Sequence, residues 1–295
     1  MVFGRGTWLL AGAAVVTCIV LVGPGEPVGA RSTAPLPAED VRDAVPNRVV
    51  TWNICNPCDE NNAGRAADIA ALAPQVIGMQ EACVRDVERM REHLKRRHGL
   101  EYHVEYGTVL GHRGRCGGTP WNPGEFGQAI LSAAPMTDRV SVEYPEGGSE
   151  DRGYVAVTTE VDGQPVRVFN THLAQRRQES VRAGQVRALA AEVARHPRAI
   201  VLGDFNAVPG AGELKGMWKL AKDADPGCRP SSSGSCKPTT DWRLKFDYVF
   251  LRGVSPVKQG VQLTPNSDHD LVHADVSLAK NRRRDGPEDV TGPRT

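Results

Sequence analysis

The sequence has few aromatic residues and almost no excess charge of either sign. Phe, Trp and Tyr make up 5% of the 295 residues, and 36 basic residues face 35 acidic ones, which leaves a net charge of +1. This balance does not support a generally basic nucleic-acid binder, although local basic patches remain compatible with it. The low aromatic content also argues against a broad apolar surface for binding lipid.

Several catalytic motifs are missing as well. No G-x-S-x-G, Walker loop or G-x-G-x-x-G occurs in a fitting context, and the histidines lack the H-E-x-x-H spacing of zinc peptidases. No internal repeat of fixed period is present. Chemistry in this chain must therefore come from residues that are dispersed along the sequence.

Residues 1–30 have the pattern of a secretory signal peptide. Arg5 supplies a positive start, an apolar run covers 8–22, and "VGA" at 28–30 offers small residues for cleavage. A membrane anchor is the alternative, but this apolar run is shorter than the roughly 20 residues that span a bilayer. A lipid anchor on Cys18 fits less well, because Thr17 is a poor residue before such a cysteine. We therefore expect export by a cleavable signal.

Cysteine usage agrees with an oxidising compartment. Without residues 1–30 the net charge stays at +1 and six cysteines remain: Cys55, Cys58, Cys83, Cys116, Cys228 and Cys236. An even number in an exported chain predicts disulfides. Cys228 and Cys236 bracket a short Pro/Ser/Gly loop and are expected to pair. Cys55 and Cys58 form a C-x-x-C with no second C-x-x-C at zinc spacing, which favours structural bridging; the remaining pairings stay open.

Hydrophobic patterns divide the rest of the chain into many strands and a few helices. A Pro/Ala/acidic linker is expected at 31–46, a single domain at 47–279 and a polar tail at 280–295. Helices are predicted at 61–74, with Asn61 or Asn62 as its cap, at 84–98 and at 178–195, and a Gly/Pro-rich loop at 107–127. Strands are predicted at 48–54, 75–81, 128–132, 139–144, 154–161, 166–171, 199–205, 245–251 and 271–278, and "DGQ" predicts a hairpin turn between 154–161 and 166–171. This order predicts a four-layer α/β sandwich, in which two mixed sheets pack face to face with helices outside.

Polar side chains recur where these strands end. The strands that carry them read "TWNIC", "GMQEAC", "FNTHLA", "GDFNAVP", "KFDYVF" and "NSDHDLVHADV". One such residue is usually a turn or cap group, but six strands that each present one at an edge can converge on a single cleft. The side chains are Asn53, Glu81, Asn170, His172, Asp204, Asn206, Asp247, Asp268 and His269.

The types of these residues limit the chemistry. Carboxylates and amides are hard oxygen ligands, which suit Mg²⁺, with Mn²⁺ or Ca²⁺ as alternatives, better than a tetrahedral zinc site. Oxygen-bound magnesium with nearby imidazoles suits phosphoryl chemistry: an acidic group activates water and an imidazole protonates the leaving oxygen.

Taken together, "WNI", "QE", "THL", "GDFN", "FDYVF" and "SDH" occur in the order typical of the endonuclease/exonuclease/phosphatase superfamily, and the chain resembles that group from Asn47 to Ala279. The resemblance implies a metal-dependent phosphoric ester hydrolase. The family's "GNAILS" is replaced by "GQAILS", with Gln128 as the departure. The resemblance assigns no role to Asp270, which is expected to cap the following strand.

The resemblance also implies roles for individual residues. The metal would be held by Glu81, with Asn53 beside it and Asp268 as a second carboxylate. Asp204 would orient or deprotonate water, and Asn206 would bind the phosphate. His172 would contact the scissile phosphate.

His269 would be the second catalytic imidazole, with Asp247 behind it to fix its tautomer. Arg152 and Asn170 would support the substrate. For Arg152, a surface charge at the start of a strand is an equally fitting interpretation.

The fold does not determine the substrate. Arg176, Arg177 and Arg182 follow His172 directly, and a loop with His112, Arg113, Arg115 and Trp121 is long enough to touch a duplex or a lipid. We expect a monomeric, extracellular endonuclease whose Arg176 and Arg177 meet DNA phosphates. A sphingomyelinase-like phospholipid phosphodiesterase, an inositol- or sugar-phosphate phosphatase and a non-catalytic binding module are the alternatives.

Overall fold

The computed structural model describes residues 43–56, 58, 61–146, 148–175 and 177–278. The predicted signal peptide and polar tail lie outside the described residues, as does Arg176. No helix in the described part of the chain is long and apolar enough to cross a bilayer.

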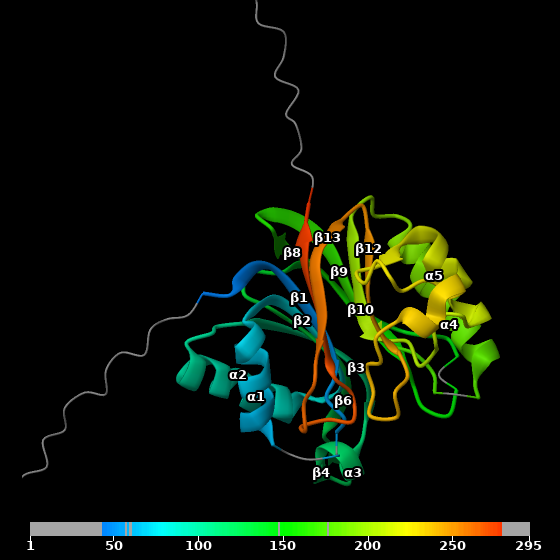
Figure 1. Ribbon diagram of the computed structural model, residues 1–295. Helices are drawn as coiled ribbons and strands as arrows, with labels where there is room; N and C mark the ends of the chain where they lie inside the picture. The colour runs from blue at the N-terminus through cyan, green and yellow to red at the C-terminus, as the bar shows by residue number, and fades with distance from the viewer. Residues whose placement is uncertain (1–42, 57, 59–60, 147, 176, 279–295) are drawn as a thin grey trace, which may run out of the picture. The chain divides into compact units, whose positions relative to one another are not determined.

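Two six-stranded sheets form the centre of the molecule, and both are mixed (Figure 1). The first has the order β13-β14-β1-β2-β6-β3 and the second β11-β12-β10-β9-β8-β7. In each sheet one central pair is parallel, β1 with β2 and β9 with β10, and every other pairing is antiparallel. Each parallel pair is joined by a crossover through one helix, α1 or α4, as parallel strands require.

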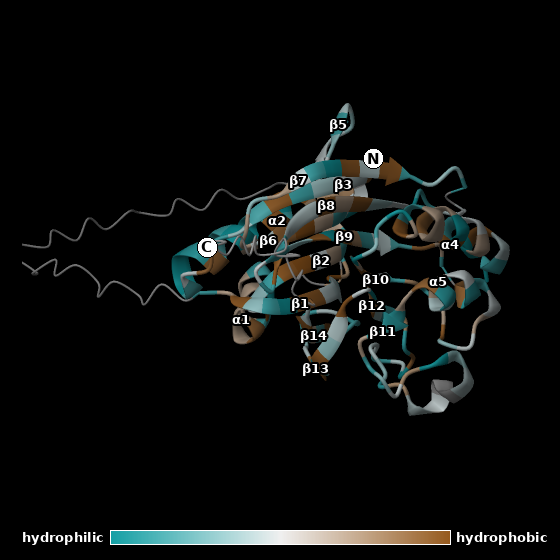
Figure 2. Cartoon of the chain, turned by 90° about the horizontal axis from the view of Figure 1, so that it is seen from above, coloured by the Kyte–Doolittle hydropathy of each residue, from teal (hydrophilic) through white to brown (hydrophobic). Residues whose placement is uncertain are grey.

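The first sheet consists of β1 (Val45–Asn53), β2 (Pro74–Cys83), β3 (His103–Gly111), β6 (Glu125–Ser132), β13 (Ser255–Gln262) and β14 (Leu271–Ser277). The second consists of β7 (Thr137–Glu143), β8 (Gly153–Val161), β9 (Gln164–His172), β10 (Ala199–Asp204), β11 (Lys222–Asp223) and β12 (Asp247–Arg252). The short strands β4 (Gly118–Thr119) and β5 (Asn122–Pro123) form a separate hairpin that stands away from both sheets (Figure 2).

Helices cover the outer faces of the two sheets. They are α1 (Asn62–Leu72) and α2 (Val84–His98) on one side and α4 (Glu179–Val193) and α5 (Lys215–Leu220) on the other. The short helix α3 (Arg113–Cys116) lies beside β4 instead, and the 3₁₀ turns are η1 (Gly212–Leu214) and η2 (Pro230–Ser235). In both views α1 and α2 lie on one side of the paired sheets, and α4 and α5 lie on the other (Figures 1 and 2). The predicted four-layer α/β sandwich is confirmed.

Three apolar layers hold this sandwich together. One lies under α1 and α2, one between the sheets, and one under α4 and α5. Side chains alternate along each strand, so Val168, Leu202 and Val249 enter the layer between the sheets while their neighbours Phe169, Val201 and Tyr248 enter the outer layer.

A glycine lets the two sheets approach closely near the polar end of this layer. A Cβ on Gly78 of β2 would lie 2.8 Å from Asn170 Oδ1 and 2.9 Å from Leu202 Cβ, both in the opposite sheet. The bare glycine leaves room for the Asn170 amide, which donates to the carbonyls of Met79 and Ala129 across the interface at 2.7 and 2.9 Å. Asn170 therefore ties the sheets together.

The strongest local patterns are confirmed. The helix predicted at 84–98 has those bounds, and its apolar stripe of Val87, Met90 and Leu94 is fully buried. The "DGQ" hairpin also forms, because Asp162 and Gly163 both adopt positive φ, 52° and 69°, as a two-residue turn of this hand requires. Asn61 caps α1 by accepting from the Gly64 amide.

Other expectations were wrong. The Gly/Pro-rich loop predicted at 107–127 contains the second half of β3, helix α3, the β4–β5 hairpin and the start of β6. β13 and α5 were not predicted at all. β1 begins at Val45, inside the segment predicted as linker, because Val45 pairs with Pro74 of β2.

Three disulfides form. Cys228–Cys236 pairs as predicted, Cys55 pairs with Cys58, and Cys83 at the end of β2 pairs with Cys116 of α3. The Cys83–Cys116 bridge attaches the segment between β3 and β6 to the first sheet. The spacing of the cysteines in the sequence did not predict this pairing.

The layer between the sheets should dominate the free energy of unfolding. Leu202 is 0% exposed, and Leu202→Ala is expected to lower the free energy of unfolding by about 2–5 kcal/mol, because it removes buried methyl groups and leaves a cavity. Leu263 is 79% exposed, and Leu263→Ala is expected to change it by less than about 0.5 kcal/mol. Urea unfolding of the two variants measures the difference, and equal midpoints would contradict this packing.

Candidate active site

The strand register of the second sheet places three ionisable side chains in one row. Asp204, the last residue of β10, pairs with His172 of β9 on one side and with Asp247 of β12 on the other. All three lie on the face that carries the apolar layer between the sheets, at the point where this layer ends. Each is at most 2% exposed, so the row is a buried polar cluster.

The first sheet completes the cluster with Asn53, the last residue of β1. Its Nδ2 lies 3.1 Å from Asp204 Oδ2 and 3.4 Å from Glu81 Oε1, so one amide group bridges carboxylates from opposite sheets. Its Oδ1 accepts from the Cys55 amide at 3.0 Å, which fixes the side chain's orientation. The turn that follows is closed by the Cys55–Cys58 disulfide and therefore supports Asn53.

Glu81 reaches the cluster through a β-bulge. The pairing of β2 with β6 slips between Met79 and Ala82, so that Gln80 and Glu81 oppose one residue of β6, Gln128. Glu81 adopts φ 52°, a left-handed conformation that is uncommon for glutamate. Bulges re-aim side chains beside functional sites, and this one turns Glu81 away from the regular alternation of β2.

His269 is held as a charged imidazolium. Its Nδ1 donates to Asp247 Oδ2 at 2.9 Å, and Thr239 Oγ1 donates to the same oxygen at 2.6 Å. Burial alone would lower the pKa of His269, but the carboxylates of Asp247 and Asp204 outweigh it and raise the pKa to about 10. The Nε2 atom, which lies 3.8 Å from Asp204 Oδ2, is then protonated as well.

His172 is held neutral in the same cluster. Burial is the main cause of a pKa well below the usual value, and the positive charges of Arg152, His269 and Arg115 lower it further. Arg152 Nη1 points a donor at His172 Nδ1 at 3.1 Å, and Asn206 Nδ2 points another at the second ring nitrogen, Nε2. That atom lies 3.4 Å from Asp204 Oδ2 and 3.0 Å from the amide of Asn206.

The pKa of Asp204 lies close to neutral pH. Burial raises its pKa to about 7, with the charge of His269 opposing the rise and that of Asp247 adding to it. Its Oδ1 accepts from the backbone amide of Asn206 at 2.8 Å, a turn that places Asn206 at φ 49°. A carboxylate that takes up a proton near pH 7 has the proton affinity of a general base.

Arg152 belongs to an ion-paired chain behind His172. Its Nη2 lies 2.8 Å from Glu150 Oε2, and Arg115 Nη1 lies 2.9 Å from Glu150 Oε1. Arg152 is 1% exposed, so it orients His172 rather than presenting its charge at the surface. The interpretation as a surface charge is therefore wrong.

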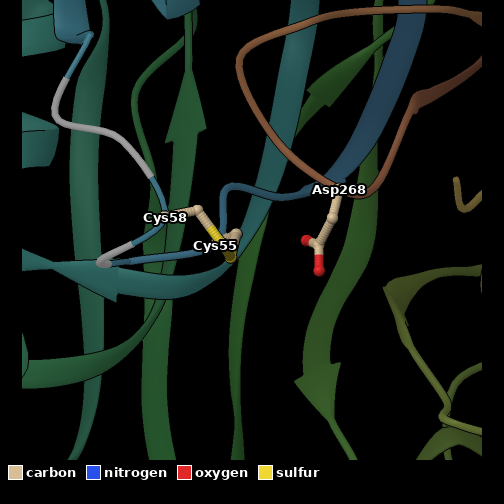
Figure 3. Close-up of side chains that lie close together, drawn as sticks. All are labelled: Cys55, Cys58 and Asp268. Atoms are coloured by element: carbon tan, nitrogen blue, oxygen red, sulfur yellow. A yellow bond between two sulfur atoms is a disulfide. The ribbon is translucent and has the colours of Figure 1, made fainter.

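Three of the predicted site residues lie elsewhere. Asn170 shares a face with His172 but sits one pleat deeper, and its amide is fully used between the sheets, with Gln80 Nε2 donating to its Oδ1 at 2.6 Å. Arg177 is exposed on a groove next to Asn206. The carboxylate of Asp268 lies beside the Cys55–Cys58 disulfide, on the loop before β14 (Figure 3).

Sequence reasoning missed the residues that support the cluster. Thr239 and Glu150 lie in irregular segments and act only through Asp247 and Arg152. The one available signal for Glu150 was an acidic residue two positions before Arg152. Arg115 was seen only as one of several loop charges. Asp270 accepts from the amide of Thr264 and so stabilises the turn before β14, close to its predicted capping role.

The oxygen donors of the cluster fit a hard divalent cation. Burial raises the pKa of both Glu81 and Asp204 although nearby positive charges oppose the rise, and the amide of Asn53 touches both carboxylates. Such a carboxylate–amide set suits Mg²⁺, Mn²⁺ or Ca²⁺. Cys55, Cys58 and Asp268 also lie within 4.8 Å of one another, but the two sulfurs are joined and offer no thiolate.

Comparison with known proteins agrees with this geometry. The sequence profile of the Endonuclease/Exonuclease/phosphatase family matches residues 50–269, and the chain belongs to this family. Members of the family are divalent-metal-dependent phosphoric ester hydrolases, and this protein is therefore an enzyme of that class. No curated protein matches the chain.

Solved structures share the fold at low sequence identity. An endonuclease/exonuclease/phosphatase from Beutenbergia cavernae is 25% identical with a TM-score of 0.62, over 79% of this chain and 71% of that one. The catalytic domain of human Nocturnin with bound sulfate is 21% identical with a TM-score of 0.62, over 79% and 95%. TDP2 of D. rerio, complexed with a single-strand DNA product, is 17% identical with a TM-score of 0.61, over 78% and 98%.

The opposite protonation of the two imidazoles is directly measurable. In metal-free protein, an NMR titration should find His269 protonated up to about pH 10 and His172 neutral throughout the range above pH 6.5. Asp247→Asn removes the principal negative charge beside His269, so its pKa should fall. A His269 that titrates at an ordinary value, or whose pKa ignores Asp247→Asn, would contradict the ion pair.

Proposed function

We propose that the protein is an exported, Mg²⁺-dependent endonuclease that hydrolyses phosphodiester bonds of DNA. The observation that carries this proposal is the buried row of His172, Asp204 and Asp247, faced by Asn53 and Glu81 and joined by His269. These groups supply an acceptor for a water proton, a donor for the leaving oxygen and ligands for a cation.

The protonation states indicate different catalytic roles for Asp204 and His269. Asp204, with a pKa of about 7, takes the proton from the attacking water. His269 carries its proton on Nε2 and gives it to the leaving oxygen, while Asp247 and Thr239 hold the ring. Asn206 offers N–H groups to the phosphate oxygens, as in other sites that stabilise developing negative charge, and His172 lies 3.0 Å from this amide.

Glu81 and Asn53 are the residues that would hold the cation. When bound, Mg²⁺ neutralises part of the phosphate charge and so assists the displacement. Asp268, the second carboxylate expected at the cation, lies within 4.8 Å of the Cys55 and Cys58 sulfurs, and its charge also acts on His269.

DNA is favoured over lipid by the surroundings of the cluster. Arg177 is exposed and lines the same groove as Asn206, where a neighbouring phosphate of a polynucleotide would lie. A membrane-binding enzyme needs a contiguous apolar patch, whereas the most exposed large apolar residue, Trp121 at 85%, stands on the β4–β5 hairpin beside polar neighbours. The TDP2 structure with a single-strand DNA product shows that this fold accommodates a polynucleotide.

Catalysis should depend on a divalent ion and on both imidazoles. Supercoiled plasmid should be nicked with Mg²⁺ and stay intact with EDTA. His269→Ala and His172→Ala should each lower the nicking rate by about 10²–10⁴-fold, because each removes a proton-transfer or phosphate-binding group.

His103→Ala, at an exposed histidine of β3, is the matched control and should retain the native rate. Plasmid and single-stranded DNA that both stay intact at high enzyme concentration would refute the nuclease. Release of phosphocholine from sphingomyelin vesicles, or of phosphate from inositol phosphates, would assign one of the other substrates.

Export is supported by the three disulfides, which form and persist in oxidising compartments. After expression of the full chain in a bacterium, the protein should appear outside the cytoplasm with its new N-terminus at Arg31 and all three bridges formed. Intact-mass analysis and N-terminal sequencing measure this. A cytoplasmic product that starts at Met1 with free thiols would contradict the proposal.

A further inference from the structure

An exposed tryptophan stands directly beside the catalytic imidazole. Trp242 is 45% exposed, and its ring meets that of His269 edge-on, with centroids 5.4 Å apart and planes at 87°. It also packs against Phe246 at 6.3 Å. A large aromatic side chain is normally buried, so one that remains half-exposed at a polar site is available to a ligand.

The backbone around Trp242 is held rigidly to the site. The Asp241 amide donates to the carbonyl of Asp268 at 3.0 Å, and Thr240 forms a β-bridge with His269. Arg243 donates its amide to the Thr240 carbonyl at 2.8 Å and adopts φ 63°, which closes a tight turn under the tryptophan. The indole is thus held in place beside His269.

Phe246, which contacts Trp242, also lines a groove that includes Asn206. The volume of this groove is about 640 Å³, within the range of small-molecule sites. Apolar groups form much of the lining, among them Val208, Leu244 and Phe246. Of its cations, Arg182 is committed to Glu213 at 2.8 Å, whereas Arg177 is exposed.

We propose that Trp242 stacks an unpaired nucleobase next to the scissile phosphate, and that the groove receives the adjoining nucleotide with Arg177 at its phosphate. This inference rests on the proposed nuclease function and refines it. A base inside a duplex already stacks on its neighbours, so only a single-stranded or displaced base can cover the indole. The enzyme should therefore prefer single-stranded over fully paired DNA.

A nucleobase fits the position beside Trp242 better than a lipid does. Trp242 is flanked in the chain by Asp241 and Arg243, two charged residues that would oppose insertion into a membrane. Stacking on a single aromatic ring needs no wider apolar surface and tolerates any base.

Binding of short oligonucleotides tests the subsite. In an Asp204→Asn background, which prevents cleavage, tryptophan emission should be quenched by a single-stranded DNA oligomer. It should respond much less to an abasic oligomer of the same length. Trp242→Ala should raise the Kd for the base-containing oligomer about 5- to 150-fold and leave that for the abasic oligomer unchanged. Trp242→Phe should restore most of the affinity, because phenylalanine keeps a stacking face.

Trp121→Ala is the comparison variant, since Trp121 is even more exposed but lies on the separate β4–β5 hairpin, and it should bind like the parent protein. If the wild type nicks plasmid while Trp242→Ala leaves the Kd unchanged, the subsite is wrong and the nuclease stands. If the wild type neither binds nor cleaves any nucleic acid, both are wrong. Loss of sphingomyelin-vesicle binding in Trp242→Ala would assign the tryptophan to a membrane instead.

Discussion

The site depends on one hydrogen bond that crosses between the sheets, from Asn53 Nδ2 to Asp204 Oδ2. It forms only because the last residues of β1 and β10 meet where the apolar layer ends. A shift of one residue in either strand would turn Asn53 or Asp204 to the opposite face of its sheet and disrupt the cluster. Packing of the two sheets is therefore the condition for the polar contacts that join residues of one sheet to residues of the other.

Low polarity around the cluster gives its charges their effect. Two histidines lie near one carboxylate, yet they take opposite protonation states, because Asp247 sits behind His269 and Arg152 sits behind His172. The chain of Arg152, Glu150 and Arg115 keeps the second of these partners in place. In water such neighbours would shift each pKa slightly, whereas burial lets them determine which imidazole donates a proton.

Sequence patterns correctly predicted the elements whose conformation depends mainly on neighbouring residues. Helix 84–98 was predicted at its observed bounds, because its apolar stripe recurs at helical spacing, and the Asp162–Gly163 turn followed from its φ requirements. Among the strands that were missed, β3 and β13 are the edge strands of the first sheet and β11 is an edge strand of the second, and β13 is largely exposed. An edge strand covers little core, so its composition carries a weak signal.

The sequence by itself determined the fold class, the family and the set of polar residues at the strand ends, because buried strands and short motifs leave their pattern in neighbouring residues. Only the tertiary structure decided which of those residues meet. Asn170 and His172 are two positions apart on one strand, yet one binds the opposite sheet and the other faces Asp204. The same holds for Glu81, which a bulge turns into the cluster, and for Trp242, which a distant loop places against His269. Packing sets the distances between segments that lie far apart in the sequence, and no local sequence pattern encodes that packing.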